Sequence, residues 1–157
     1  MKLHFRILIF LSILFWTSLI FIELIASKLP YLINFIPFFK KAFSLVCHQQ
    51  HNKLLVIYNT ETLVCSRCLG IYLGFLIMSL YNLFKEINIQ LKIKIFIISA
   101  APAIIDVTLT TVGIYPYSKL IAFTSGFLLG SIVFLYFYQS LTELISENRR
   151  IRIEKVH

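Results

Sequence analysis

Charged residues are scarce in this sequence of 157 residues: Asp, Glu, Lys and Arg make up 14% of it, against 59% hydrophobic residues. This balance lies outside the range of soluble globular proteins. The short motifs of familiar soluble enzymes are missing as well, namely a phosphate-binding glycine loop, a Gly-x-Ser-x-Gly elbow and a His-Glu-x-x-His zinc helix. The sequence therefore indicates an integral membrane protein and excludes the classes that those motifs mark.

Long apolar runs predict an all-α membrane protein of about four transmembrane helices, folded as a single integral-membrane domain over residues 1–157. A helix needs about 20 apolar residues to cross the hydrocarbon core. The expected spans are residues 7–26, 69–84, 93–113 and 120–138. The first run exceeds the core of a signal peptide, so we expect it to be a retained helix. The second is slightly short, so we expect it to begin a turn earlier, near Cys65–Cys68.

A further apolar run, from Pro30 to Phe39, lies between the first two expected spans. It is interrupted by Pro37 and ends in Lys40-Lys41, so it is too broken to cross the bilayer. We expect an interfacial segment whose Phe and Tyr side chains lie at the level of the lipid headgroups. A loop packed over the helix bundle is the alternative.

Lys and Arg are distributed unevenly along the chain. Nine fall in segments 1–6, 85–94 and 140–157, whereas only six fall in segments 27–68 and 114–119, which are longer in total. The positive-inside rule therefore predicts a multi-pass protein of the cell membrane with both termini cytoplasmic and the Cys/His loop, residues 27–68, facing outward.

Much of the net charge of +8 follows from this bias and from the run Arg149-Arg150-Ile151-Arg152 within the basic tail, residues 140–157. Such a tail suits anionic lipid of the inner leaflet, and no nucleic acid partner is expected.

Small residues recur at four-residue spacing in two of the expected helices: Gly70 and Gly74 in one, and Ala122, Gly126 and Gly130 in the other. This spacing predicts close helix–helix contact, because small side chains let two backbones approach.

Four short helices with one intramembrane carboxylate offer little for a monomeric permease, so transport would require a homo-oligomer.

Three cysteines and two histidines lie beside the second expected span, in the runs Cys47-His48-Gln49-Gln50-His51 and Cys65-Ser66-Arg67-Cys68. Three thiolates and one imidazole form a zinc-type ligand set, and the loop between the runs is long enough to close it. The fourth ligand is either His48 or His51. His51 shares a face with Cys47 if the segment is helical, whereas His48 requires an extended backbone or a turn.

Two other interpretations compete with a metal site. Cys65 and Cys68 could exchange disulfides with partner thiols, with Cys47 as the resolving thiol, and Arg67 beside a helix N-terminus would favour that chemistry by lowering a thiol pKa. The cysteines could instead be small buried residues, or a local structural disulfide with Cys47 left free. Spacing for four ligands is a stronger pattern than a lone Cys-x2-Cys, so it favours zinc.

Asp106 is a carboxylate inside the third expected span, where a charge is costly unless it is paired. It lies near the depth at which the second helix begins, so Arg67 is the expected partner. Hydroxyls nearby come from Thr108, Thr110 and Thr111. The pair is either a tether between two helices or part of an active site, which makes Asp106 and Arg67 the catalytic candidates.

Several of these residues form a signature: Cys-His-Gln at 47–49, Cys-Ser-Arg-Cys-Leu-Gly-Ile-Tyr-Leu-Gly at 65–74, Pro102 with Asp106, Ser118, Thr124-Ser125-Gly126 and Gly130. Over residues 43–131 the chain resembles a family of small prokaryotic integral-membrane proteins of unknown function. The resemblance implies a ligand set of Cys47, His48, Cys65 and Cys68, with Arg67 and Asp106 as companions and His51 as a reserve ligand.

Two positions depart from the pattern of that family, both on the side where a substrate would be held. Val107 stands where a glycine is expected, and Ala122 where a basic residue is expected. The resemblance names no reaction. Three hypotheses follow: a structural or binding zinc site, a metal-dependent membrane enzyme that uses Asp106 on a lipid-borne substrate, and a thiol–disulfide oxidoreductase acting through Cys65 and Cys68. Saturated thiolate-rich sites are typically structural, which favours the first.

Overall fold

The computed structural model describes residues 3–26, 29–57, 60–85 and 92–154, with the backbone alone at 30 and 147–154. Lys2, Lys28 and Lys155, which entered the charge count above, lie outside these ranges. The helices are α1 (Leu3–Leu19), α2 (Ile22–Ala26), α3 (Ile36–Ser44), α4 (Ser66–Phe84), α5 (Ile93–Val112) and α6 (Lys119–Glu154). Between them lie two 3-10 helices, η1 (Pro30–Phe35) and η2 (His51–Lys53), and two strands, β1 (Leu54–Ile57) and β2 (Thr60–Cys65).

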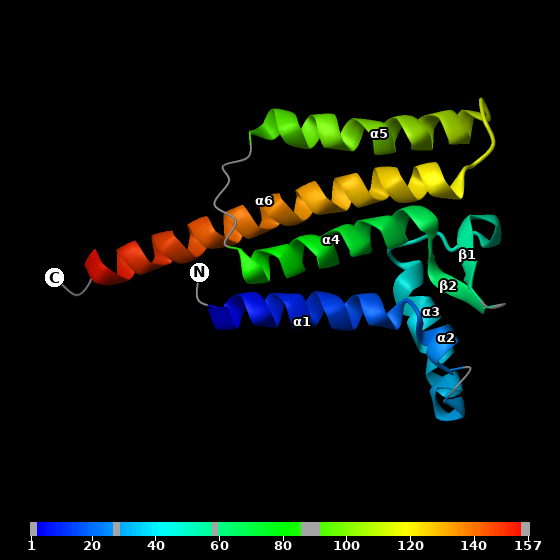
Figure 1. Ribbon diagram of the computed structural model, residues 1–157, viewed down its shortest axis with the longest axis horizontal. Helices are drawn as coiled ribbons and strands as arrows, with labels where there is room; N and C mark the ends of the chain where they lie inside the picture. The colour runs from blue at the N-terminus through cyan, green and yellow to red at the C-terminus, as the bar shows by residue number, and fades with distance from the viewer. Residues whose placement is uncertain (1–2, 27–28, 58–59, 86–91, 155–157) are drawn as a thin grey trace.

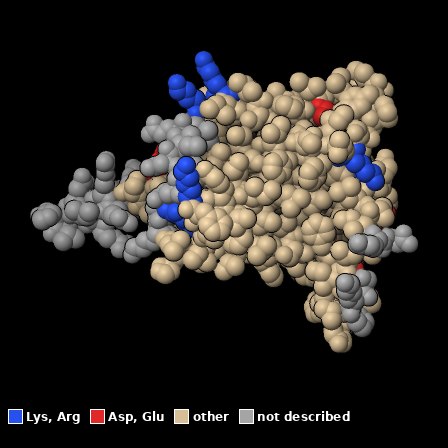
Figure 2. Space-filling model, in the orientation of Figure 1, with Lys and Arg blue, Asp and Glu red and all other residues tan. Residues whose placement is uncertain are grey.

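The four long helices form a row in the order α1, α4, α6, α5, with both termini at one end (Figure 1). Three described helices are long and apolar enough to cross a membrane: α4, α5 and the Lys119–Ser146 part of α6. The apolar α1 has 17 residues, the lower end of the spanning range. The middle of the visible face carries almost no charge, and most visible Lys and Arg lie toward the end with the termini (Figure 2). The predicted all-α membrane class with about four helices is confirmed.

The ends of two helices differ from the expected spans. α1 stops at Leu19 instead of running to residue 26, and a turn at Ile20 and Phe21 separates it from α2. The peptide N–H of Leu63, in β2, donates to the Ile20 carbonyl at 3.3 Å. In a continuous helix the Ile20 carbonyl would accept a hydrogen bond from within the helix. Here it accepts one from β2 instead. At the other end of the chain, α6 continues as helix through the basic tail as far as Glu154.

Close contact between α4 and α6 sets the position of the cysteine-bearing end of α4. A Cβ added at Gly70 would lie 2.3 Å from the Phe123 carbonyl oxygen, and one at Gly126 would lie 2.3 Å from the Arg67 carbonyl oxygen. No side chain fits at such a distance, so these positions require glycine. The small residues predicted to form a helix–helix contact do form one.

The segment between α1 and α4 projects sideways from the end of the bundle opposite the termini (Figure 1). α2, η1 and α3 form its arm, and the antiparallel pair β1–β2 leads back into α4. Tyr31 is 75% exposed and Phe35 and Phe38 are also exposed, whereas Phe43 is buried against the hairpin. These exposed rings are compatible with an interfacial segment, whose location at the headgroups stays a prediction. The hairpin is an addition to the predicted all-α architecture.

Candidate metal centre

Three cysteines meet where the loop enters α4. Cys47 follows α3, Cys65 ends β2 as the N-cap residue of α4, and Cys68 lies in the first turn of that helix. Their sulfur atoms all lie within 4.8 Å of one another, and all three are free of disulfides. Among the described residues, these three cysteines are the group of metal-type side chains that the fold brings together.

The surroundings of Cys47 stabilise a thiolate. Its side chain is 4% exposed, and its sulfur accepts a hydrogen bond of 3.2 Å from the peptide N–H of Cys65. Hydrogen bonds from the Cys65 and Cys68 side chains hold the pKa of Cys47 well below its usual range. The same contact with Cys47 raises the pKa of Cys65. A thiol with a lowered pKa is suited to binding a cation.

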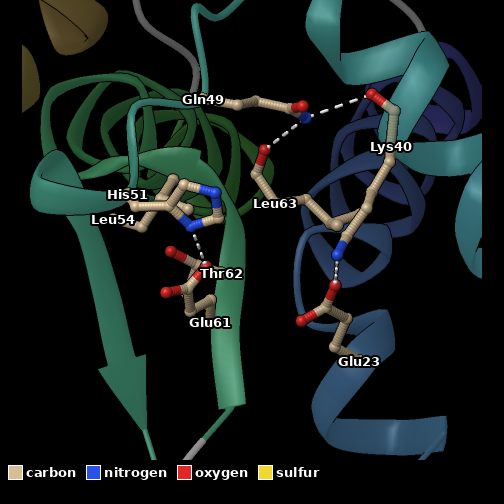
Figure 3. A pocket seen from close by; sticks show the side chains of 8 residues that line it. All are labelled: Glu23, Lys40, Gln49, His51, Leu54, Glu61, Thr62 and Leu63. Carbon is tan, nitrogen blue, oxygen red and sulfur yellow. Dashed lines mark hydrogen bonds and ion pairs between the residues drawn. The ribbon is translucent and has the colours of Figure 1, made fainter.

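Gln49 holds the Cys47 segment in place. Its backbone has φ 46°, in the left-handed region, so the chain turns sharply just after His48. Its side-chain amide donates to the Leu63 carbonyl at 2.8 Å and to the Lys40 carbonyl at 3.1 Å (Figure 3). One side chain thus ties the loop to both β2 and α3.

The two candidate histidines lie in different places. His48 is exposed and lines the same cavity as the three cysteines, although it is outside the cysteine group itself. The His51 side chain is 87% exposed, and its Nδ1 lies 2.9 Å from Glu61 Oε2 in a separate small pocket that Gln49 also lines (Figure 3). The structure therefore brings His48, and not His51, to the cysteine side of the loop.

A cavity of about 520 Å³ adjoins the cysteines. Its walls come from the loop, from the start of α4 and from α5: residues 46–50, Lys53, Cys65, Arg67, Cys68, Val107 and Thr111. Val107, one of the two departures from the family pattern, thus lies in the cavity wall. The other departure, Ala122, is fully buried.

Asp106 is 3% exposed and has both carboxylate oxygens engaged. Arg67 pairs with Oδ2, and the Tyr115 hydroxyl donates to Oδ1. The hydrogen bond to Asp106 raises the pKa of Tyr115. Of the threonines expected nearby, Thr110 donates its hydroxyl to the backbone carbonyl of Asp106. Asp106 joins α4, α5 and the loop after α5, and it is not part of the cavity wall.

Two contributors near the site were not predicted. Tyr115 lies in the loop after α5, where a Tyr-Pro-Tyr run shortly beyond Asp106 was the available signal. Lys53 lines the cavity, with its ammonium 5.4 Å from the centre of the Tyr117 ring. The Lys53 carbonyl also accepts a hydrogen bond of 3.2 Å from the Ser66 hydroxyl, which joins the loop to the first residue of α4.

Apolar helices in a row, with a thiol cluster at one end of one of them, define a small multi-pass membrane protein with a cysteine-rich site. The chain belongs to the family described as "Predicted membrane protein (DUF2085)", whose model matches residues 47–136. This match begins at Cys47 and includes the other two cysteines and Asp106. The expected resemblance to a membrane family of unknown function is confirmed.

A relative in the archaeon Methanocaldococcus jannaschii, "Uncharacterized protein MJ1492", is 29% identical over 153 residues. The aligned region covers 92% of this chain and 97% of the relative. The two proteins are therefore similar over nearly their whole lengths. No solved structure matches the chain.

Proposed function

We propose that Cys47, Cys65, Cys68 and His48 bind one zinc ion that fastens the loop 27–68 to the start of α4. The protein is then a small binding or assembly module of the membrane with a structural metal site. The observation that carries the proposal is the convergence of three sulfur atoms within 4.8 Å from separate elements, namely the segment after α3, the end of β2 and the first turn of α4.

The donor set fits zinc in number and in kind. Tetrahedral zinc with bonds of about 2.3 Å separates two sulfur ligands by about 3.8 Å, so small side-chain movements would complete the geometry. Thiolates with one imidazole favour zinc over harder cations such as magnesium or calcium. The Cys65 N–H that donates to the Cys47 sulfur is the kind of outer contact that orients a thiolate ligand.

His48 is the better fourth ligand because of where the backbone places it. It neighbours Cys47, lines the cysteine cavity, and no described residue engages its exposed ring in a hydrogen bond. A change of rotamer would bring the imidazole toward the sulfurs. His51 already lies against Glu61, so using it would break that contact.

Asp106 and Arg67 serve, in this proposal, as a tether between α4 and α5. Both carboxylate oxygens have protein partners, and the carboxylate is outside the cavity wall. A general base would need a free oxygen facing the substrate. The geometry therefore supports a positional role over a catalytic one.

The proposed location is the cell membrane, with the cysteine site on the outer face and both termini cytoplasmic. Both termini lie at one end of the helix row, as an even number of crossings requires (Figure 1). The helical extension of α6 would carry the basic tail toward anionic lipid on the cytoplasmic side.

Metal content tests the proposal. The protein would be purified in detergent under reducing conditions, and its zinc measured by mass spectrometry beside Cys68→Ser, His48→Ala and His51→Ala. We expect about one zinc per chain, lost in Cys68→Ser and reduced in His48→Ala. His51→Ala is the matched control and should keep its zinc. A metal-free wild-type protein would overturn the zinc proposal.

A thiol–disulfide oxidoreductase is the second candidate, because the proximity of Cys65 and Cys68 and the lowered pKa of Cys47 also suit disulfide exchange. The same preparation distinguishes the two. A Cys65–Cys68 disulfide that forms and reopens in membranes, with no bound metal, would support the redox function.

A metal-dependent enzyme acting on a lipid-borne substrate is the third candidate. It is favoured by the position of His48 outside the cysteine group, since three protein ligands leave one coordination position open, as in catalytic zinc sites. Zinc that survives unchanged in His48→Ala would support this open site.

A further inference from the structure

The cavity beside the cysteines is lined by cations and has no carboxylate in its wall. Its charged side chains, apart from the cysteines, are Lys53 and Arg67. Its volume of about 520 Å³ lies within the range of small-molecule sites. Such a wall favours a ligand that carries negative charge.

Both cations keep donors that the protein does not use. The Nε of Arg67 is buried and has no hydrogen-bond partner among the described residues, although the same guanidinium binds Asp106 through another nitrogen. The Lys53 ammonium lies over the Tyr117 ring, and no described carboxylate lies within ion-pair distance of it. A buried donor without a partner is costly, so an acceptor from outside the protein would stabilise this arrangement.

The proposed zinc does not make the site anionic. Three thiolates and one Zn²⁺ sum to −1 and Lys53 contributes +1, while the charge of Arg67 is offset by its ion pair with Asp106, so the site as a whole has no net charge. Donors on two sides suit a phosphate group, which offers three terminal oxygens, better than a carboxylate, which offers two.

The position of the cavity indicates how a ligand would enter. Val107 and Thr111, which complete the wall, are exposed residues on the membrane-spanning helix α5. The cavity therefore borders the surface that α5 presents to lipid. A phosphate attached to a lipid could reach it from the bilayer, and a soluble phosphate could reach it from the aqueous side.

We propose that this cavity binds a phosphate group through the Lys53 ammonium and the guanidinium of Arg67, a lining residue whose Nε has no partner among the described residues. The proposal rests on the proposed zinc site, because the metal would hold Cys47 and His48, which form one wall of the cavity. It adds a ligand class to a site for which the family suggests none.

Equilibrium binding of two probes to zinc-loaded protein tests the proposal. Glycerol 1-phosphate would be added to protein in detergent, and phosphatidic acid would be presented in phosphatidylcholine nanodiscs. We expect binding of at least one probe, weakened roughly tenfold in Lys53→Gln by the loss of one charge-assisted hydrogen bond. Val107→Phe narrows the cavity without changing charge and should weaken binding as well.

Lys41→Gln, on the exposed side of α3, is the matched control and should bind like the wild type. Binding of phosphatidic acid alone would identify a lipid headgroup, and binding of both probes a soluble phosphate as well. Equal affinity in wild type, Lys53→Gln and Lys41→Gln, or no binding of either probe, would overturn the proposal. Zinc is measured in the same samples, so loss of the metal site is separable from loss of the phosphate site.

Discussion

At the scale of single residues, Asp106 shows how the chain accommodates a charge within a spanning helix. One oxygen is bound by a cation from α4 and the other by a phenol from the loop after α5. Removing one member of a buried ion pair costs more than the pair itself contributes, because the remaining charge stays desolvated. The role of Asp106 can therefore be tested by a change that preserves its shape.

We predict that Asp106→Asn lowers the free energy of unfolding by about 3 kcal/mol and leaves zinc content unchanged. The amide keeps the volume of the carboxylate, but it leaves the Arg67 charge without a counter-charge. Thermal unfolding in detergent, with metal analysis of the folded protein, measures both quantities. Thr108→Val, on the exposed face of α5, is the control and should have little effect. Loss of zinc in Asp106→Asn would contradict a tether separate from the metal site.

Gln49 shows what sequence reasoning can and cannot find at this scale. The Cys-His-Gln motif drew attention to Gln49. The sequence also allowed a turn here, since His48 could act as a ligand only with an extended backbone or a turn. The two carbonyls that Gln49 binds come from α3 and β2, which approach only in the folded chain. No spacing within the motif encodes those partners.

At the scale of elements, the contact between α4 and α6 could be predicted because it depends on a local pattern. Glycines four residues apart lie on one face of a helix whatever the rest of the fold does. The break in α1 after Leu19 could not be predicted. No proline or glycine marks it, and the Leu63 N–H that uses the freed Ile20 carbonyl comes from β2, beyond α2, α3 and β1 in the chain.

The hairpin was missed for a different reason. Residues 54–57 and 60–65 are rich in β-branched side chains, which is a strand signal, but two strands of four and six residues are short. Such a hairpin is marginal alone and is stabilised here by packing on α2 and α3. Its consequence for the site is direct, because β2 delivers Cys65 to Cys47.

We predict that Gly126→Ala destabilises the protein by about 2 kcal/mol or more, as overpacking does. The new methyl group would lie 2.3 Å from the Arg67 carbonyl, so α4 and α6 must move apart. Gly113→Ala is a matched comparison with open space around it, where only the left-handed backbone, φ 79°, opposes a side chain, at about 1 kcal/mol. Unfolding midpoints of the two variants in detergent measure the difference. Equal midpoints would contradict the close contact.

At the scale of the whole molecule, the distribution of charge predicts orientation. We expect a fluorescent protein fused after residue 157 to be fluorescent, and alkaline phosphatase fused at the same point to be inactive, because both termini are predicted to be cytoplasmic. Each reporter is active on only one side of the membrane, and the two sides are opposite. One active reporter therefore shows that the fusion protein is expressed. Active phosphatase would place the cysteine site on the cytoplasmic side.

The proximity of the cysteines and the Arg67–Asp106 pair were predictable, whereas the surroundings of the site were less so. Two cysteines three positions apart at the start of a helix must be neighbours, and Arg67 and Asp106 could be matched by depth along their helices. Predicting the cavity would have required knowing how η2 and α5 approach each other across the end of α4. Lys53 and Val107 lie on these two elements, distant in the chain, and no local pattern links them.

The length of α6 has a mechanical consequence. Its 36 residues extend about 54 Å, whereas the hydrocarbon core is about 30 Å thick. The glycine contacts with α4 lie near one end of this helix and include Arg67, the neighbour of Cys68, and the other end lies with the termini. A tilt of ~10° about those contacts would displace the far tip by ~7 Å. If α6 tilts in this way, a small shift beside the thiol cluster would become a larger displacement at the end of the helix that lies with the termini.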